Sequence, residues 1–131
     1  MGYNLAKRTM KKLAIVLIAM LGFCFAANAQ QDKASVPGDY GNTVLVSVSD
    51  DSHTSSTLTF YNNSTKSIKV CVSVYNAQGS KVGSDCYYVS GASAQGHHSK
   101  STDTLYKKSP SGTSSGCETK RIKIDSVTVQ N

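Results

Sequence analysis

Few residues in this sequence have the type and spacing that catalysis or metal binding requires. The histidines are His53 and the adjacent pair His97-His98. The pair lacks the i, i+2 or i, i+4 spacing that places two imidazoles on one side, and no thiolate or carboxylate cluster accompanies it. Asp50-Asp51 stands in a polar turn pattern, where aspartate is expected for its local backbone hydrogen bonds. We therefore expect no metal site and no cofactor.

No nucleophile stands out either. Serine is abundant, with 20 copies after residue 29, and abundance by itself marks none of them as reactive. A cysteine nucleophile would need an identifiable base, and none is apparent. The sequence contains neither a glycine-rich phosphate loop nor a calcium-binding loop. We expect that the protein is not an enzyme.

The tyrosines give a better indication of a binding surface. Tyrosine combines apolar area with a hydroxyl group, so an exposed set can stack on sugar rings or form the centre of a protein interface. In the strand pattern described next, Tyr61, Tyr75 and Tyr87 fall on the side of the sheet that faces away from the core. The sequence therefore predicts these three residues as ligand-binding.

Residues 56–89 contain the strands that must position this surface. Thr57–Tyr61 and Ile68–Tyr75 alternate apolar and polar residues at the strand period of two, and a third strand ends at Val89. The polar turn between the first two strands and the Asn76–Ser80 loop between the next two suit antiparallel hairpins, with Gly79 in the left-handed position. The pattern predicts a three-stranded meander in which Phe60 pairs with Val70.

The cysteines set the covalent question. Cys24 belongs to an N-terminal segment expected to be removed, which leaves Cys71, Cys86 and Cys117 and permits one intramolecular bridge. The predicted second hairpin pairs Val70 with Cys86, so that Cys86 faces the core and Cys71 faces away, and a bridge between them would need a bulge. Cys86–Cys117 is therefore favoured, while Cys71–Cys86, Cys71–Cys117 and the absence of a bridge stay open.

The remaining segments complete an all-β domain. Thr43–Ser49 predicts a strand before the meander, Thr102–Lys107 a short edge strand, and Ile122–Val129 a final strand with a bulge near Asp125-Ser126. Residues 30–42 read as a flexible lead-in, and Ser90–Lys100 as a loop. No window shows helical spacing of apolar residues. We predict a single antiparallel β-sandwich of six to seven short strands over residues 43–131.

Residues 1–29 have the composition of a targeting segment. Basic residues come first, the apolar run Leu13–Phe25 follows, and Ala27-Asn28-Ala29 offers small residues for cleavage. The pattern resembles a bacterial secretory signal peptide, and the apolar run is shorter than the roughly 20 residues that span a bilayer. We expect cleavage after Ala29, with lipidation at Cys24 as the alternative. The mature protein would then have no membrane span and be secreted, periplasmic or at the cell surface.

Removing this segment also changes the charge. Four of the 14 basic residues lie within it, so ten basic and eight acidic residues remain, a net charge of +2. Lys107-Lys108 and Lys120-Arg121-Lys123 are small clusters typical of solvated strand ends rather than of phosphate contacts. We therefore expect no nucleic-acid partner.

The meander, with its Tyr61–Ser64 turn and its Val72–Gly79 hairpin, resembles the small exported Ig-like or fibronectin-III-like sandwiches of bacteria. That resemblance implies an adhesive, carbohydrate-associated or assembly module. The expected function is an exported, non-catalytic module that binds a protein or glycan partner through a sheet face or long polar loops. Two alternatives stay open: a structural subunit of a surface or matrix assembly linked by Cys71 or a strand edge, and a small inhibitor of a secreted hydrolase. The sequence does not predict the oligomeric state.

Overall fold

The computed structural model describes residues 30–112 and 116–131, and within these ranges it contains seven strands. The predicted signal peptide, residues 1–29, lies outside the described residues. The strands are β1 (Gln31–Val36), β2 (Asp39–Asp50), β3 (Ser55–Asn62), β4 (Ile68–Tyr75), β5 (Lys81–Val89), β6 (Ser99–Tyr106) and β7 (Arg121–Val129). In the part of the chain that the structure describes, no helix is long and apolar enough to cross a membrane.

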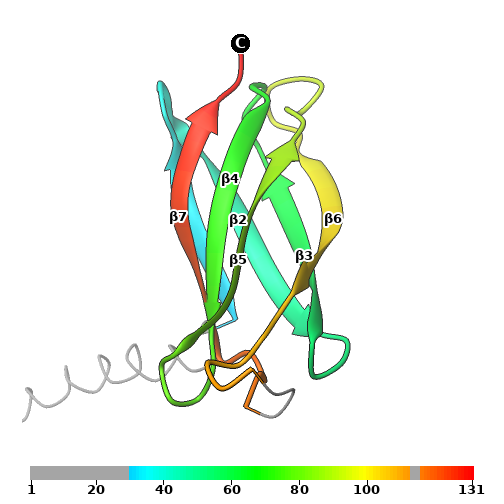
Figure 1. Ribbon diagram of the computed structural model, residues 1–131. Helices are drawn as coiled ribbons and strands as arrows, with labels where there is room; N and C mark the ends of the chain where they lie inside the picture. Colours follow the sequence, from blue (N-terminus) through cyan, green and yellow to red (C-terminus); the bar gives the residue numbers. More distant parts are fainter. Residues whose placement is uncertain (1–29, 113–115) are drawn as a thin grey trace, which may run out of the picture.

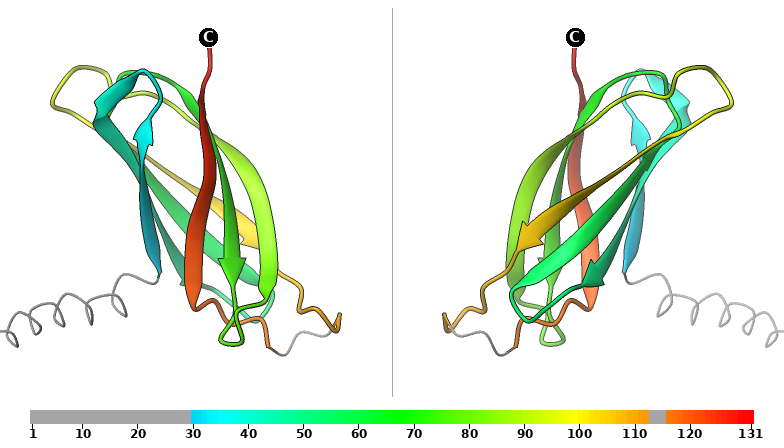
Figure 2. Two further views of the ribbon diagram at one scale, coloured as in Figure 1. Left: turned by 90° about the vertical axis from the view of Figure 1, so that its left-hand side faces the viewer. Right: turned by 90° about the vertical axis from the view of Figure 1, so that its right-hand side faces the viewer.

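The strands form two antiparallel sheets that lie face to face (Figures 1 and 2). One sheet has four strands in the order β1-β2-β3-β6, and the other has three in the order β5-β4-β7. The predicted all-β, two-sheet architecture is confirmed.

The core lies between the sheets and is built from alternate residues of each strand. On β3, Leu58 and Phe60 are almost fully buried, while the alternate residues Thr57 and Thr59 face outward. The ring of Phe60 meets that of Tyr87 from the other sheet, with centroids 5.4 Å apart. Valine dominates the rest of the core, at Val36, Val44, Val46, Val48, Val70, Val72, Val74, Val82 and Val89. Strand alternation therefore identified the buried faces of β2, β3 and β4 correctly.

The predicted meander is wrong, because β3 and β4 belong to different sheets. Phe60 pairs with Val46 of β2 and with Ser101 of β6, not with Val70 of β4. The alternation of apolar and polar residues shows which side of a strand is buried, but it does not show which strands pair. Two strands that face each other across the core have the same alternation as two hydrogen-bonded strands of one sheet.

Asn62 holds the turn that carries the chain from one sheet to the other. Its buried side chain donates to the carbonyl oxygens of Lys66 (2.8 Å) and Ser90 (3.0 Å) and accepts from the backbone N–H of Ser64 (3.0 Å). Gly91 lies against the same turn, where an added Cβ would come within 2.3 Å of the carbonyl oxygen of Thr65. The polar stretch that suggested a hairpin is thus a crossover between layers.

The prediction of a flexible lead-in over residues 30–42 is also wrong. β1 pairs with β2 from Gln31 opposite Ser47 to Ser35 opposite Thr43. Within its six residues only Ala34 and Val36 are apolar, since an edge strand buries little of its surface. Two apolar residues are too few to reveal, in the sequence, the alternation of apolar and polar residues that marks a strand.

The opposite end of the sandwich is held by a buried ion pair. The Lys107 side chain is 0% exposed, and its Nζ donates to Asp50 Oδ1 at 2.8 Å and to Thr119 Oγ1 at 3.3 Å. Asp50 also accepts from Ser56 Oγ (2.7 Å) and from the backbone N–H of Thr119 (2.9 Å). Burial alone raises the pKa of Asp50, but these hydrogen bonds outweigh it and hold the pKa below its ordinary value. Lys107 is therefore not the solvated strand end that the sequence suggested.

The division into four and three strands is that of immunoglobulin constant domains, but the strands are distributed differently. In those domains the first, second, fifth and fourth strands form one sheet, and the third, sixth and seventh form the other. Here β3 extends the first hairpin, and β5 joins β4 in the second sheet. The likeness to the immunoglobulin fold is one of architecture and not of strand order.

Candidate functional site

The three tyrosines predicted to share one face lie in three different places. Tyr61 is on the outer face of the four-stranded sheet, and Tyr75 is on the outer face of the three-stranded sheet. Tyr87 is 6% exposed, and its hydroxyl donates to the carbonyl oxygen of Thr104 at 3.1 Å. Burial raises the pKa of Tyr87 far above its ordinary value, with a smaller contribution from nearby carboxylates. Tyr87 is thus a core residue, and no ligand surface contains all three.

A one-residue bulge in β5 explains the position of Tyr87. Val74 pairs with Gly83 rather than with Val82, and Tyr75 pairs with Lys81, so Val82 is the extra residue. Because side chains alternate, this shift reverses the facing of every later residue of β5. A Cβ at Gly83 would lie 3.0 Å from the carbonyl oxygen of Tyr106, so glycine suits this close approach. A glycine inside a strand pattern was the signal that could have revealed the bulge.

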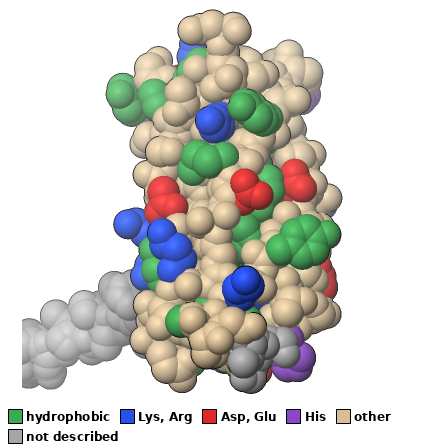
Figure 3. All heavy atoms as spheres, in the orientation of Figure 1, with side chains coloured by type: hydrophobic (Ala, Val, Ile, Leu, Met, Phe, Trp, Pro, Cys, Tyr) green, Lys and Arg blue, Asp and Glu red, His purple; other side chains and the backbone are tan. Residues whose placement is uncertain are grey.

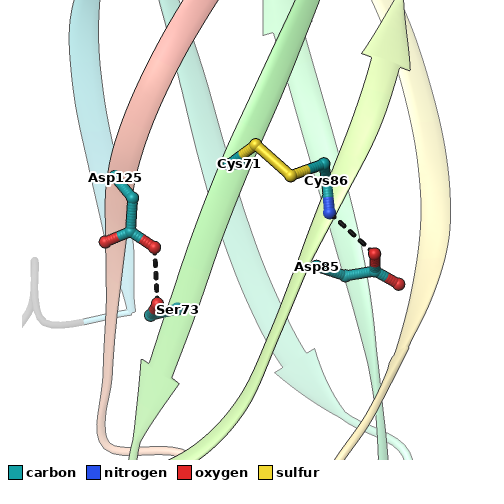
Figure 4. Close-up of a disulfide and its surroundings, with 5 residues drawn as sticks. All are labelled: Cys71, Ser73, Asp85, Cys86 and Asp125. Atoms are coloured by element: carbon teal, nitrogen blue, oxygen red, sulfur yellow. Dashed lines mark hydrogen bonds between the residues drawn. A yellow bond between two sulfur atoms is a disulfide. The ribbon is translucent and has the colours of Figure 1, made fainter.

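The same bulge overturns the predicted Cys86–Cys117 bridge. Cys71 now pairs with Cys86 across β4 and β5 on the outer face, and a disulfide joins them with a Cα–Cα distance of 3.9 Å (Figure 4). Cys117 is not part of this disulfide and is 0% exposed. Cys71 is therefore not available to link copies of the chain.

The outer face of the three-stranded sheet carries charges of both signs. Around the disulfide, Ser73 donates to Asp125 at 2.5 Å, and Asp85 accepts from the backbone N–H of Cys86 (Figure 4). Figure 3 views this side of the molecule, where acidic side chains lie across the middle and basic side chains lie above and below them. The aromatic side chains here already have cationic neighbours: Lys69 lies 6.0 Å from the centroid of the Tyr88 ring, and Arg121 lies 4.2 Å from that of Tyr75.

The outer face of the four-stranded sheet is organised around Tyr61. The register places Lys33, Leu45, Tyr61 and Lys100 opposite one another, so a single row crosses all four strands. Lys100 Nζ lies 5.8 Å from the centroid of the Tyr61 ring, and the His98 ring meets its edge at 5.9 Å. The row thus has an apolar and aromatic centre with a cation at each end.

A hollow of about 250 Å³ opens beside this row. Its lining combines Leu45 and Tyr61 with the polar side chains of Lys33, Thr43, Asn63 and His98. Asn63 is held in place, because its Oδ1 accepts the backbone N–H of Thr43 at 2.7 Å. A second hollow, of about 410 Å³, shares Lys33 and Leu45 and is also lined by Gln31 and Asp32. Apolar area beside fixed polar groups is the usual composition of a recognition site.

The paired outward positions of this face are hydroxyl-rich. On these four strands, within the described residues, they are Gln31, Lys33, Ser35, Thr43, Leu45, Ser47, Ser49, Ser55, Thr57, Thr59, Tyr61, Lys100, Thr102, Thr104 and Tyr106. Nine of them are serine or threonine, two are lysine and none is acidic. Asp51, just after β2, lies at the margin of this face, where its carboxylate accepts the hydroxyl of Thr57 at 2.7 Å.

Aspartates cover the edges of both sheets. On the edge strands β1, β5 and β6, an aspartate accepts the backbone N–H of the next residue at 2.8–2.9 Å: Asp32 with Lys33, Asp85 with Cys86, and Asp103 with Thr104. In register these aspartates lie opposite buried residues of the neighbouring strand, so they occupy positions that face the core side. Inward-pointing charges on edge strands oppose pairing with another chain.

Contacts between the two sheets cover further edge groups. Asp32 Oδ2 accepts the backbone N–H of Ile124 on β7 at 2.7 Å, and Tyr87 of β5 donates to Thr104 of β6. Register shifts interrupt β1, β5 and β7, and the shift in β7 confirms the bulge predicted near Asp125. The edges are therefore poorly suited to adding a strand from a second copy.

The histidines do not come together. His53 precedes β3 at one end of the sandwich, while His98 precedes β6 at the other, where Ser99 pairs with Asn62. Among the described residues, no group of three histidine, cysteine, aspartate or glutamate side chains could hold a metal ion.

One serine stands in the Gly-x-Ser-x-Gly spacing that some hydrolases use. Gly112 and Gly116 flank Ser114 in the Gly-x-Ser-x-Gly order, but residues 113–115 lie outside the described residues. That motif acts at a sharp turn from a strand into a helix. Gly116 is followed by irregular chain and then by β7, so the context of a nucleophile elbow is not found in the described residues around it.

No protein-family model, curated protein or solved structure matches this chain.

Proposed function

We propose that this protein is an exported, non-catalytic recognition module that binds a protein or glycan partner through the outer face of its four-stranded sheet. The observation that carries the proposal is the hollow at Tyr61, where apolar area lies beside an amide, an imidazole and two ammonium groups. The disulfide is consistent with export, because such bonds persist in oxidising compartments outside the cytosol. We place the mature protein in the periplasm, at the cell surface or in the medium.

The four-stranded face is favoured over the three-stranded one for a physical reason. A ligand gains most from polar groups that are fixed before binding and still have bonding capacity to offer. On the three-stranded face, Ser73 and Asp125 bond to each other, and Tyr75 stacks with Arg121. On the four-stranded face, Asn63 lines the hollow and is fixed through its oxygen, so its amide nitrogen has donor capacity to offer.

A role as an assembly subunit has less support. It depended on Cys71 as an intermolecular tether or on an open strand edge. Cys71 is bridged to Cys86, and aspartates and bulges protect the edges. An inhibitor role would use the loop after β5, residues 90–98. The start of this loop, however, is hydrogen-bonded to Asn62 and Ser64 and so helps to hold the crossover between the sheets.

The test compares two matched tyrosine variants. Purified protein would be assayed by affinity electrophoresis against neutral and acidic polysaccharides, and by cross-linking to the exported proteins of the producing cell. We expect Tyr61→Ala to abolish retention or cross-linking and Tyr75→Ala, an equivalent change on the opposite sheet, to leave it intact. Binding that survives Tyr61→Ala but not Tyr75→Ala would move the site to the three-stranded sheet and overturn the proposal.

A further inference from the structure

We infer that the Tyr61 face recognises an acidic polysaccharide, a glycan whose sugars bear carboxylate or sulfate groups. This inference rests on the proposed function and specifies its ligand. It is carried by the charge of the face, by the placement of its two cations and by the kind of groups that surround them.

The charged side chains at the paired outward positions of this face are all cations. Lys33 and Lys100 project from the outward rows, and the paired outward positions contain no acidic residue. Asp32, next to Lys33 in the chain, lies on the inner side of β1 and is bonded to the backbone N–H groups of Lys33 and Ile124. Asp32 also lines the hollow beside Lys33, but in the row itself Leu45 and Tyr61, and no carboxylate, lie between the two ammonium groups that an approaching anion would meet.

The two cations are spaced for an extended ligand. Lys33 and Lys100 occupy opposite ends of a row of four strands, so their backbones are about 14 Å apart at the usual strand spacing. Tyr61 and Leu45 lie between them. A chain of sugars laid along this row would place ring faces on the aromatic centre and charged groups near both ends. A single small anion would reach only one cation.

The surrounding groups favour a glycan over an acidic protein. Protein interfaces have a core of aromatic, aliphatic and arginine side chains that is depleted in small polar residues. Here Leu45, Tyr61 and Tyr106 are the large apolar side chains among the paired outward positions of these strands, and nine serine and threonine residues share those positions. Asn63, held by Thr43, adds a fixed amide. Hydroxyl and amide groups on a gently twisted surface match the hydroxyls and ring oxygens of a polysaccharide.

The other charged surface serves as an internal control. The three-stranded face also carries lysines, among them Lys69 and Lys123, but Asp125 and Asp85 lie among them. If charge complementarity alone drew acidic polymers to any lysine of this protein, both faces would respond equally. If the row at Tyr61 is the site, only its own lysines matter.

The experiment is affinity electrophoresis of the intact, disulfide-bonded protein in gels that contain polygalacturonate, alginate, chondroitin sulfate or, as neutral polymers, dextran and xylan. We expect retention by at least one acidic polymer, decreasing with added salt because ion pairs at an exposed surface are screened. Lys33→Gln with Lys100→Gln is expected to weaken this binding by about tenfold, since two charge-assisted contacts are lost. Lys69→Gln with Lys123→Gln, of equal charge change, should leave it unchanged.

Three results would overturn the inference. The first is retention by neutral polymers equal to that by acidic ones, and the second is equal loss in both lysine pairs. The third is absence of retention by every acidic polymer. If, in any of these cases, a partner is still bound and Tyr61→Ala abolishes that binding, the proposed function holds and only the acidic-polysaccharide inference is wrong. If Tyr61→Ala leaves the binding of every partner unchanged, the proposed function itself is wrong.

Discussion

The buried pair of Lys107 and Asp50 predicts an asymmetric response to mutation. Asp50→Asn keeps the size of the side chain but removes the counter-charge of an ammonium group that is 0% exposed. Breaking a buried ion pair from one side costs about 3–5 kcal/mol, because the remaining charge is left without compensation. Asp50 is 28% exposed, so water can reach the ammonium through the altered site, and we expect the lower end, about 3 kcal/mol.

Lys107→Met should be the milder change. It removes the buried charge itself, while Asp50 keeps its bonds from Ser56 and from the backbone of Thr119 and its partial contact with water. We expect a loss of about 1 kcal/mol. The double variant should be more stable than Asp50→Asn alone, since no charge is then buried without a partner.

Thermal and urea unfolding of the oxidised protein would measure both effects. For a domain of this size, a loss of about 3 kcal/mol lowers the melting temperature by roughly 12–24 °C. The pKa of Asp50 is held below its ordinary value of 3.8, so its contribution is fully present above that pH and is lost as the pH falls through the folded-state pKa. The difference between the wild type and Asp50→Asn should therefore shrink in acid below about pH 4. A difference that is under 1 kcal/mol at pH 7, or that does not shrink in acid, would refute the reasoning.

Two further predictions concern the crossover and the sheet edges. Gly91→Ala should lower the free energy of unfolding by about 2 kcal/mol, because the added methyl group would overlap the neighbouring turn. Gly41→Ala is the control: its Cβ would meet open space, so the free energy of unfolding should change by under about 0.5 kcal/mol. Equal effects of the two variants in urea unfolding would contradict the packing at this turn. Replacing both Asp85 and Asp103 by Val should expose two strand edges and produce concentration-dependent self-association in analytical ultracentrifugation. Asp51→Val, which lies outside the edge strands, should not produce self-association. A double variant that stays monomeric would show that these carboxylates do not prevent pairing at the edges.

The strands of this fold were predictable, and their neighbours were not. β4 was predicted at its observed limits, Ile68–Tyr75, and the position of Gly79 in the hairpin is confirmed by its φ of +81°. Both features depend on local chemistry, namely alternation and turn conformation. The assignment of β3 to the other sheet depends on Asn62 bonding to Ser90, 28 positions later in the chain. A local pattern cannot encode such a contact, so the predicted meander joined strands from two layers.

The predicted tyrosine site was wrong for two reasons: Tyr61 and Tyr75 lie on different sheets, and a bulge in β5 turns Tyr87 inward. Three errors, the facing of Tyr87, the facing of Cys86 and the choice of disulfide, follow from one extra residue at Val82. Register is a cumulative property, so one unrecognised bulge reverses every later assignment on that strand. Tyr61 precedes the error along the chain, and its outward facing was predicted correctly. The row that surrounds Tyr61 could not be predicted, because β1 was taken as flexible and Lys100 as part of a loop.

The distribution of acidic residues connects the protected edges with the proposed binding face. All eight acidic residues after position 29 are placed either on edge strands or at strand ends and turns. On the edges, Asp32, Asp85 and Asp103 cover backbone groups that could otherwise pair with a second copy. The same placement keeps carboxylates out of the paired outward positions of the four-stranded sheet, where Lys33 and Lys100 are the charged residues. A module that must stay monomeric and still hold an acidic polymer meets both requirements by confining its carboxylates to the margins of its sheets.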